Sequence, residues 1–382
     1  MVDPELELKS ADSQSIFQSQ YQSKSISENK SQPDPHKQPA GASGDCYILA
    51  VETSCDETSA SVVKNGSEVL SNIISSQIDT HRAFGGVVPE VASRKHVEVI
   101  TLIMEEALEK AGVTPDELSA VAVTQGPGLV GALLVGVVAA KSFAFALGKP
   151  LIATHHIAGH IYANRLVREL RYPCVALVVS GGHTELVLME REGHFRLIGR
   201  TRDDAVGEAY DKVARAIGFP YPGGPFVDKA ALESPAAEEL PRVWLEPDSY
   251  DFSFSGLKSA VLNLVNRSKM KGETPDYGAI ARGFQESVIE VLVEKAIRAV
   301  RSTSAEQLLL CGGVAANKGL RAALTERCGR EGVELIIPPL AYCTDNAAMI
   351  GAAAYLKWQT GEYANLSLKA DPGLSLEAWS VE

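Results

Sequence analysis

The sequence predicts an α/β protein of two similar lobes, and three observations support this fold class. From Cys46 onward, short apolar segments of strand length alternate with longer segments of helical period. An arrangement of strand, polar tip and strand occurs twice, once in each half of this region. A glycine pair, Gly312-Gly313, stands where a later strand should enter a helix. The 382 residues, 45% of them hydrophobic, suffice for a large core divided between two lobes.

The first half reads as a strand pair followed by alternating helices and strands. The apolar patterns predict strands at 47–51 and 60–64, a helix at 97–111, a buried strand at 120–124, a long helix at 131–147 and a short strand at 148–153. The second half repeats this order, with paired strands at 175–179 and 184–189 and later strands at 308–311 and 334–337, each followed by a helix. Between the strands at 184–189 and 308–311, the polar, proline-rich segment 220–275 shows few strong helical or strand periodicities. We interpret this segment as an insertion that covers a site.

The glycine-bearing tips indicate what the two lobes hold. A hairpin tip with small residues exposes backbone N–H groups that can bind a phosphate, and a glycine loop at the start of a helix suits a nucleotide. A single glycine pair usually makes only a turn. Three such signals in a duplicated layout predict a two-lobed fold of the actin, sugar-kinase and Hsp70 type (ASKHA), with βββαβαβα lobes and a cleft between them.

This layout predicts the domain organisation. The expected lobes are 46–172 and 173–345, with a helix near 346–362 that packs back on the first lobe and a C-terminal tail at 363–382. The first 45 residues are rich in Ser, Gln, Lys and Asp and lack apolar periodicity, so we expect a disordered tail. With no apolar h-region and no arginine, this segment resembles neither a signal peptide nor a transit peptide.

Charge and cysteine content restrict the function classes. The net charge is −12, and because residues 1–45 hold seven acidic residues and four lysines, the rest carries −9. Such a charge argues against a protein that grips RNA without partners. The six scattered cysteines form no CxxC pair, which favours a reducing, cytoplasmic compartment. The longest apolar run, 129–140, is too short to span a membrane and suggests a packed core helix.

His156 and His160 are the strongest candidates for chemistry. Their i, i+4 spacing places both imidazoles on one face of a helix, close enough to share a metal ion. The alternative is two surface histidines that fall in register by chance. A metallopeptidase is disfavoured, because Ile157 stands where the HExxH motif needs a glutamate base.

Taken together, the motifs resemble the tRNA adenosine threonylcarbamoyltransferase family, called TsaD in bacteria. The resemblance runs from about Tyr47 to about Tyr363, nearly all of the predicted folded region. The shared motifs, in order, are ETSCDET at 52–58, HRAFGGVVPE at 81–90 with ASR at 92–94, HHIAGH at 155–160, SGGHT at 180–184, GEAYDK at 207–212, YPGGP at 221–225, FSFSGLK at 252–258, the Gly312 loop and CTDNAAM at 343–349.

The resemblance implies a reaction and partners. The family transfers the threonylcarbamoyl group of threonylcarbamoyl-AMP to N6 of the adenosine just 3′ of the anticodon in tRNAs that read codons beginning with A, and releases AMP. It works with a shorter paralogue that dimerises with it and with a small ATPase. The alternatives are a kinase or ATPase of the same fold, which would not need both histidines, and a non-catalytic scaffold of a tRNA-modification complex.

The resemblance also implies a metal site at His156, His160 and Asp345, with one divalent ion per subunit, Fe²⁺ favoured and Zn²⁺ possible. The alternative for Asp345 is a helix N-cap. Residues implied to bind substrate are Val178, Val179, Ser180, Gly181 and Gly182 near the phosphate, and Asp211, Gly224, Asp228 and Asn317 on the nucleoside.

Two further groups are candidates with open alternatives. Asp56 and Glu57 are adjacent carboxylates at the first tip, and one of them can act as general base towards the N6 amine; the alternative is a solvated acidic turn. For Asp211 the alternative is an ion pair with Arg215. Candidate tRNA contacts are the basic clusters His81-Arg82 and Arg94-Lys95-His96, and Arg165, Arg168 and Arg171, for which a solvated helix face is the alternative.

Overall fold

The structure is a computed structural model and describes residues 44–381. The predicted disordered tail, 1–45, therefore lies outside the described residues except for its last two positions. Two five-stranded mixed sheets form the framework of the described chain. The first has the order β3-β2-β1-β4-β5, and the second the order β10-β9-β6-β7-β8.

The two sheets are built in the same way. Each starts with three antiparallel strands, and two later strands then add in parallel beside the first of them. The bounds are β1 Tyr47–Glu52, β2 Glu57–Lys64, β3 Glu68–Ser76, β4 Ala120–Gly126 and β5 Leu151–His155, and then β6 Cys174–Val179, β7 Thr184–Met189, β8 Phe195–Arg200, β9 Gln307–Cys311 and β10 Glu334–Ile336. This repetition confirms the predicted duplicated α/β fold. We call the part built on the first sheet the first lobe and the part built on the second sheet the second lobe.

The helices connect these strands. They are α2 Ile78–Arg82, α3 Pro89–Ala111, α4 Val130–Leu147, α5 His156–Tyr162, α6 Val206–Ala216, α7 Gly224–Glu233, α8 Ser255–Met270, α9 Tyr277–Thr303, α10 Lys318–Glu331 and α11 Ala347–Thr360, with short 3₁₀ turns η1 Pro115–Glu117, η2 Ala163–Leu166, η3 Gly313–Ala316, η4 Leu340–Tyr342 and η5 Glu377–Trp379. Helix α3 begins eight residues before the predicted start at 97, because Pro89 occupies its first turn, where a missing N–H costs nothing.

The segment 220–275 is more regular than we expected. It contains α7 and α8, although few strong periods were readable in its sequence. Leu257, Val261 and Val265 form a narrow apolar stripe on α8 and are buried in the same core as Val175 and Leu177 of the second sheet. One apolar residue per turn is a weak periodic signal in a polar sequence, so the helix could not be predicted from hydrophobic periodicity.

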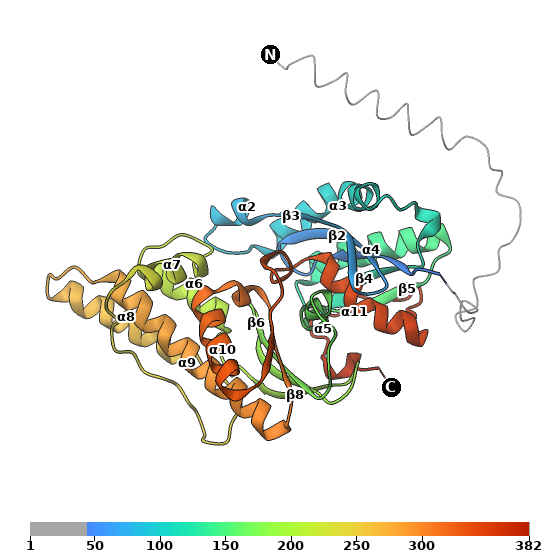
Figure 1. Ribbon diagram of the computed structural model, residues 1–382. Helices are drawn as coiled ribbons and strands as arrows, with labels where there is room; N and C mark the ends of the chain where they lie inside the picture. The colour runs from blue at the N-terminus through green and yellow to red at the C-terminus, as the bar shows by residue number, and fades with distance from the viewer. Residues whose placement is uncertain (1–43, 382) are drawn as a thin grey trace, which may run out of the picture. The chain divides into compact units, whose positions relative to one another are not determined.

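Helices α5 and α11 lie between the two sheets (Figure 1). On α11, Met349 and Ile350 share a core with β1 residues, whereas Ala352 and Ala353 share a core with β6 residues. A helix that is buried on both sides needs apolar residues around its whole circumference, and α11 has them. The two helices approach closely at Gly159, where an added Cβ would lie 2.7 Å from Ile350 Cδ1.

The segment 363–381, predicted as a tail, is bonded to both lobes. Trp379 is buried and its Nε1–H donates to the carbonyl of Ala153, at 2.9 Å. The backbone N–H of Asp371 donates to Gln125, at 2.9 Å, and that of Val381 donates to Gly193, also at 2.9 Å. The Trp379 bond holds β5, the strand that leads into α5, and the other two bonds reach β4 and the turn between β7 and β8.

Helix α4 is apolar apart from Lys141 and Ser142, and among the described helices it alone has the length and composition that a membrane span requires. The core helices of many globular proteins share those properties. One face packs in the core of the first lobe through Val137, Ala140 and Ala144. The opposite face leaves Val130, Leu134, Val138 and Phe145 exposed, so the helix is less fully packed than we predicted.

Candidate active site

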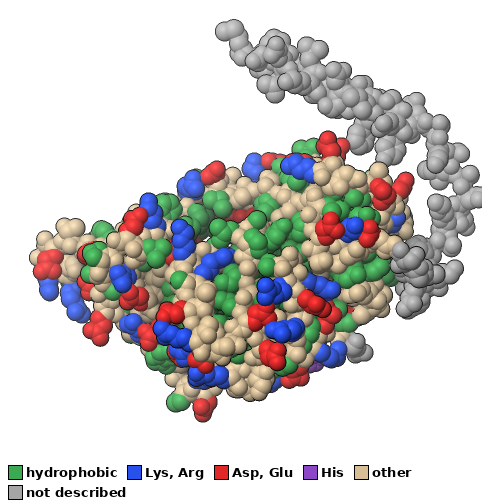
Figure 2. Space-filling model, viewed as in Figure 1, with side chains coloured by type: hydrophobic (Ala, Val, Ile, Leu, Met, Phe, Trp, Pro, Cys, Tyr) green, Lys and Arg blue, Asp and Glu red, His purple; other side chains and the backbone are tan. Residues whose placement is uncertain are grey.

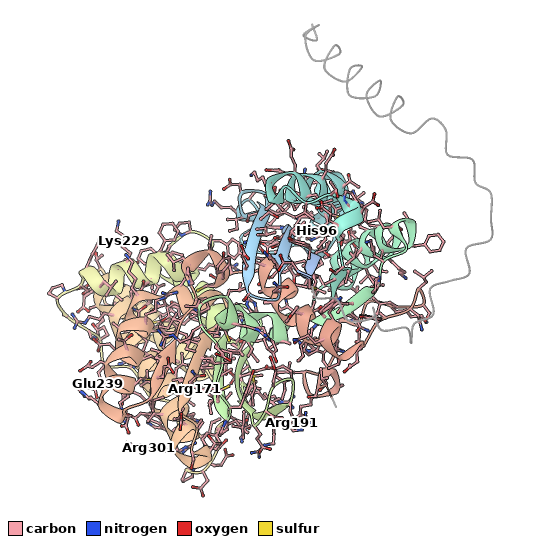
Figure 3. The ribbon with its side chains drawn as sticks, turned by 45° about the vertical axis from the view of Figure 1, so that its right-hand side comes forward. His96, Arg171, Arg191, Lys229, Glu239 and Arg301 are labelled. Carbon is pink, nitrogen blue, oxygen red and sulfur yellow. The ribbon has the colours of Figure 1, made fainter. Side chains whose placement is uncertain are left out.

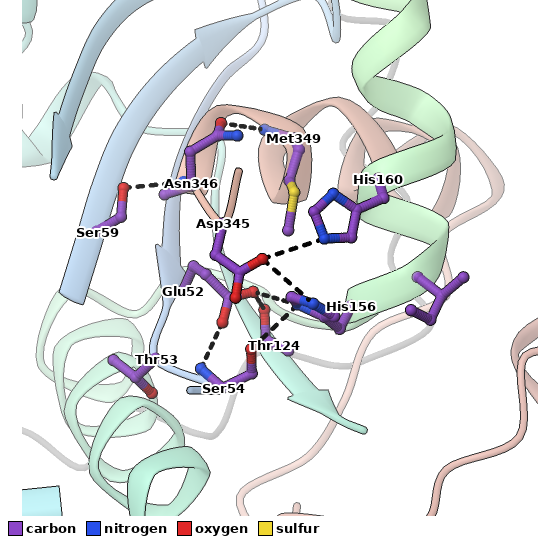
Figure 4. Close-up of polar contacts among 12 residues, drawn as sticks. Glu52, Thr53, Ser54, Ser59, Thr124, His156, His160, Asp345, Asn346 and Met349 are labelled. Atoms are coloured by element: carbon purple, nitrogen blue, oxygen red, sulfur yellow. Dashed lines mark hydrogen bonds and ion pairs between the residues drawn. The ribbon is translucent and has the colours of Figure 1, made fainter. Parts of the chain in front are cut away.

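His156, His160 and Asp345 form one compact group at the junction of the lobes (Figure 4). Their ligand atoms all lie within 4.8 Å of one another. Asp345 Oδ1 lies 3.1 Å from His160 Nε2 and 3.6 Å from His156 Nε2. Two imidazole nitrogens and one carboxylate oxygen that converge in this way are a donor set suited to a divalent transition metal.

Local structure explains how these side chains meet. Strand β5 runs directly into α5, and His155 caps the helix by accepting from the N–H of Ile157 at 3.1 Å. The i, i+4 spacing then places the two imidazoles 4.7 Å apart, edge to face. On the other side, Asn346 rather than Asp345 is the N-cap of α11, because its side chain accepts from Met349 N–H. Asp345 is thus not the cap that the alternative required.

A buried carboxylate, Glu52, orients His156. Its Oε2 accepts from His156 Nδ1–H at 3.1 Å and from the Thr124 hydroxyl at 2.6 Å, and its Oε1 accepts from the N–H of Ser54. Because Nδ1–H faces Glu52, it is Nε2 that faces Asp345, and Nε2 could bind a metal ion there once its proton is displaced. The residues present therefore fit a metal ion, with a carboxylate–histidine pair behind the ligand (Figure 4).

The electrostatics of the group agree with this assignment. Burial disfavours a charged His156, but the negative charges of Asp345 and Glu52 outweigh it and raise its pKa to about 9. Burial lowers the pKa of His160. The site thus concentrates negative charge around two imidazoles, which is the environment that a cation stabilises.

The predicted base candidates lie at the β1–β2 tip, residues 53–56 with Glu57 at the start of β2. Asp56 is buried, and Glu57 accepts a hydrogen bond from Ser76 at 3.2 Å. Burial, together with the charges of Asp345 and Asp56, raises the pKa of Glu57 well above its usual range. The tip is therefore not a freely solvated acidic turn, and its carboxylates lie near the metal-binding group.

The β6–β7 tip, residues 180–183, follows Val178 and Val179. Ser180 closes it, because its N–H donates to the His183 carbonyl at 2.8 Å while its Oγ accepts from His183 N–H at 3.0 Å. Gly181 and Gly182 are exposed, and an added Cβ would meet no atom within 4 Å at either one. Burial, and then the proximity of His156 and His160, lowers the pKa of His183 to about 4. This tip therefore lies close to the same histidines.

The residues predicted to bind the nucleoside fall into two groups, each joined by hydrogen bonds. Asp211 accepts from the N–H of Gly223 at 2.6 Å, just before Gly224, while Arg215 donates to the carbonyl of Gly85 instead of pairing with Asp211. Asp228 accepts from Gln285 at 3.0 Å and from Lys318 N–H at 3.1 Å. Asn317 caps α10 and donates to Gln285 at 2.8 Å. The structure thus brings Asp228 and Asn317 together through Gln285.

The predicted basic clusters are only partly available to RNA, because Arg82 and Arg94 are exposed whereas the histidines beside them are not. His81 and His96 are buried, and His96 lies inside the first lobe (Figure 3). Arg165 pairs with Glu192, and Arg168 and Arg171 both pair with Glu334. The histidines of these clusters were therefore wrongly assigned to the surface, and the three arginines are bound to carboxylates of the same chain.

Three residues of this region escape the sequence-based reasoning. Glu52 is the most important of them, because it bonds His156. A glutamate at the end of an otherwise apolar strand is the sequence feature that could have identified it. His183 lies in a motif that we read only for its glycines. Gln285 has no local signal, because it becomes a partner of Asn317 only when α9 packs beside α10.

Comparison with known proteins identifies the family. A family model described as tRNA N6-adenosine threonylcarbamoyltransferase matches residues 68–352. Proteins of that name from Shouchella clausii (strain KSM-K16) and Geobacillus thermodenitrificans (strain NG80-2) are 62% identical over 332 residues and 61% identical over 333 residues. These matches cover 87% of this chain in both cases, and 99% and 97% of the two relatives.

Solved structures resemble the fold at low identity. Full-length HypF, in its phosphate- and nucleotide-bound form, has a TM-score of 0.55 at 16% identity over 84% of this chain and 47% of HypF. Component A of the Acidaminococcus fermentans (R)-2-hydroxyglutaryl-CoA dehydratase has a TM-score of 0.51 at 16% identity over 83% of this chain and 99% of that one. These likenesses concern the two-lobed fold alone. On the sequence matches, the chain belongs to the tRNA N6-adenosine threonylcarbamoyltransferase family, and it is a transferase of tRNA threonylcarbamoyladenosine modification.

Proposed function

We propose that the chain transfers the threonylcarbamoyl group of threonylcarbamoyl-AMP to N6 of the adenosine just 3′ of the anticodon, in tRNAs that read codons beginning with A, and releases AMP. The observation that carries this proposal is the grouping of His156, His160 and Asp345 next to two hairpin tips of different chemistry. One tip holds carboxylates, and the other holds exposed glycines.

We infer one divalent ion per subunit, Fe²⁺ in preference to Zn²⁺, held by the Nε2 atoms of His156 and His160 and by Asp345. The convergence of these atoms within 4.8 Å and the Glu52 hydrogen bond behind His156 support this inference. When bound, such an ion would polarise the carbonyl or phosphate oxygens of the adenylate. Glu52 keeps the proton of His156 on Nδ1, away from the ligand side.

The second lobe is suited to hold the adenylate. Ser180 and the backbone N–H groups of Gly181 and Gly182 are proposed to face the phosphate, with Val178 and Val179 behind them. Asp211, Gly224, Asp228 and Asn317 are proposed to hold the nucleoside. The exposure of both tip glycines supports this role, because a phosphate can approach a backbone that carries no side chain.

A carboxylate of the first tip is proposed to take the proton. In the transfer, the N6 nitrogen forms a bond to the carbamoyl carbon, the bond from that carbon to the phosphate oxygen breaks, and AMP leaves with the electron pair. The amine must lose one proton, which Asp56 or Glu57 accepts. The raised pKa of Glu57 supports a base role, since a stronger base is a better proton acceptor.

Partner subunits are proposed to share the work of holding tRNA. The net charge is −12, and Lys, Arg, Asp and Glu are interspersed over the face shown in Figure 2, without a continuous basic band. The shorter paralogue is proposed to cover the apolar face of α4, where Val130, Leu134, Val138 and Phe145 are exposed. A small ATPase is the other proposed partner.

The cytoplasm is the proposed compartment. All six cysteines are free thiols, and five of them are buried. Such a set fits a reducing environment, where buried cysteines serve as small apolar side chains.

A reconstituted transfer assay tests the proposal. The protein and its partner subunits receive unmodified tRNA, threonine, bicarbonate and ATP, with the adenylate synthase present. Wild-type protein is expected to form the modified nucleoside, and Asp56→Asn or Glu57→Gln to lose about 100-fold or more in rate. Glu68→Gln, on exposed β3, is the matched control. Nucleotide hydrolysis without modified tRNA would favour the kinase or ATPase alternative, and two fully active tip variants would remove the general base.

A further inference from the structure

The loop between α2 and α3, residues 83–88, joins two helices of the first lobe and contacts the second lobe. The Arg82 Nε–H at its start donates to the carbonyl of Tyr221 at 3.3 Å. From the second lobe, Arg215 on α6 donates to the carbonyl of Gly85. Because each hydrogen bond joins the two lobes, the loop is held across their junction. We call residues 82–88 the crossing loop.

The crossing loop lies beside the proposed reacting groups. Burial raises the pKa of Tyr221, and the negative charges of Asp56 and Asp211 raise it further. Two residues after Tyr221, the N–H of Gly223 donates to Asp211 at 2.6 Å. On the first lobe, Gln77 N–H donates to the carbonyl of Asp56 at 3.0 Å, immediately before α2.

The backbone of the crossing loop is fixed, whereas its aromatic side chain is free. The buried His81 accepts through its carbonyl from Gly86 N–H at 3.3 Å and through Nδ1 from Val88 N–H at 3.3 Å. Phe84 nevertheless stays 61% exposed. On the second lobe, Phe226 of α7 is 42% exposed, two residues after Gly224. An exposed aromatic ring on a fixed backbone beside a reaction site offers a flat surface on which an unstacked base can stack.

Charge favours RNA as the occupant of this surface. Arg82 has one ion-pair partner, Asp79, whose side chain is almost fully exposed, and such a pair contributes little and is readily replaced. Arg215 has no carboxylate within ion-pair distance among residues 44–381. Two arginines beside an exposed aromatic ring form the combination that binds single-stranded nucleic acid, with stacking on the ring and phosphates on the cations.

We propose that Phe84 stacks on a base of the tRNA anticodon loop next to the acceptor adenosine, and that Arg82 and Arg215 contact the flanking phosphates. This inference rests on the proposed transfer to N6. An enzyme that acts on a base must take that base out of its stack, which costs a few kcal/mol. A ring that replaces the lost stacking partner offsets this cost, and Phe84 is placed to do so.

The experiment uses the protein assembled with its partner subunits and an anticodon stem-loop that carries 2-aminopurine in place of the acceptor adenosine. Because 2-aminopurine has no N6 amine, this stem-loop reports only on base unstacking, and the KM for tRNA is measured with unmodified tRNA. Its fluorescence rises when the base leaves the stack. Wild-type complex is expected to produce this rise, and Phe84→Ala to reduce it and to raise the KM for tRNA about 10-fold, with the KM for the adenylate unchanged. Phe84→Trp should restore both. Met270→Ala, at an 88% exposed position on the end of α8, is the control.

The outcomes separate the inference from the proposed function. If Phe84→Ala matches the wild type in fluorescence and KM, or if Phe84→Trp fails as Phe84→Ala does, the stacking role is wrong. If wild-type complex forms no modified tRNA, the proposed function itself fails and the inference fails with it. Arg215→Gln provides the test of the phosphate contact, because it should weaken tRNA binding and reduce the slope of log affinity against log salt by about 1.

Discussion

The β1–β2 tip and the β6–β7 tip occupy equivalent positions in two sheets of identical strand order, yet they differ in burial and charge. Within six residues the first tip has three carboxylates, Glu52, Asp56 and Glu57, and two of them are buried. Residues 180–183 of the second tip have none, and both glycines there are exposed. The repeated sheet thus fixes where a tip lies, and the tip residues decide which chemistry is available there.

The same duplication explains the metal-binding group. In the first lobe, the fifth strand in chain order, β5, leads into α5 with His156 and His160. In the second lobe, the corresponding strand, β10, leads through η4 to Asp345 and α11. Equivalent exits of the two sheets therefore supply opposite sides of the proposed ligand set, and neither lobe holds all three residues.

The largest effect is expected when one of the two histidines that the first lobe contributes is removed. His160→Ala should abolish metal binding and lower the transfer rate by about 1000-fold, because the remaining ligands no longer hold an ion that polarises the adenylate. Metal content by mass spectrometry and modified nucleoside by chromatography measure the two effects. His194→Ala, in the β7–β8 turn, is the control. Full activity of a metal-free His160→Ala protein would contradict the assignment.

A smaller effect is expected when the buried carboxylate of Glu52, the last residue of β1, is neutralised. Glu52→Gln retains the shape but removes the charge that His156 Nδ1–H meets at 3.1 Å. Loss of such a partner typically weakens metal affinity about 10- to 100-fold. Competition with a chelator gives the affinity, and Glu68→Gln again serves as the control. Equal affinities of Glu52→Gln and wild type would show that the hydrogen bond does not orient the ligand.

The second lobe can be tested at its glycine pair. Gly312 has φ +91, and an added Cβ would lie 2.4 Å from the carbonyl oxygen of Val179. Because the obstacle is backbone, Gly312→Ala should reduce the free energy of unfolding by about 2 kcal/mol and weaken adenylate binding. At Gly313 an added Cβ meets nothing within 4 Å, so Gly313→Ala should be nearly neutral for stability. Denaturant unfolding of both variants measures the two effects. Equal stabilities of Gly312→Ala and Gly313→Ala would show that close packing at Gly312 does not fix this loop.

The smallest expected effect concerns pH and the support of the first tip. Buried His96 accepts from the Thr58 hydroxyl at 2.7 Å and donates to the Cys55 carbonyl at 2.9 Å. Burial lowers its pKa, so its contribution to stability is complete above about pH 6.5 and is lost as the pH falls below that value, by at most about 1.4 kcal/mol per pH unit.

His96→Gln keeps one acceptor and one donor but does not titrate. The stability advantage of wild type over this variant, measured by denaturant unfolding, should therefore shrink between pH 7.5 and pH 5. An advantage that stays constant over this range would mean that His96 titrates alike in the folded and unfolded chains. All other histidines cancel in the difference.

The sequence was most informative where function depends on spacing within one element. The i, i+4 histidines and the duplicated tips were predictable, because a helix or a hairpin fixes those geometries locally. The resemblance supplied Asp345, which no local pattern could assign. Glu52 and Gln285 were missed because their partners His156 and Asn317 come from other elements. Helix α8 was missed because its apolar stripe is only one residue wide.

The position of α11 has a consequence for how the protein is made. This helix covers the inner face of the first sheet, and the N–H of its first residue, Ala347, donates to Ser59, which lies 288 positions earlier in the chain. At typical translation speeds, the ribosome needs roughly 15 to 60 s to synthesise the residues between them. During that time the apolar surface around Ile48 and Ala50 lacks its cover. The nascent first lobe is thus a natural client for chaperones, and its final packing must occur late in synthesis.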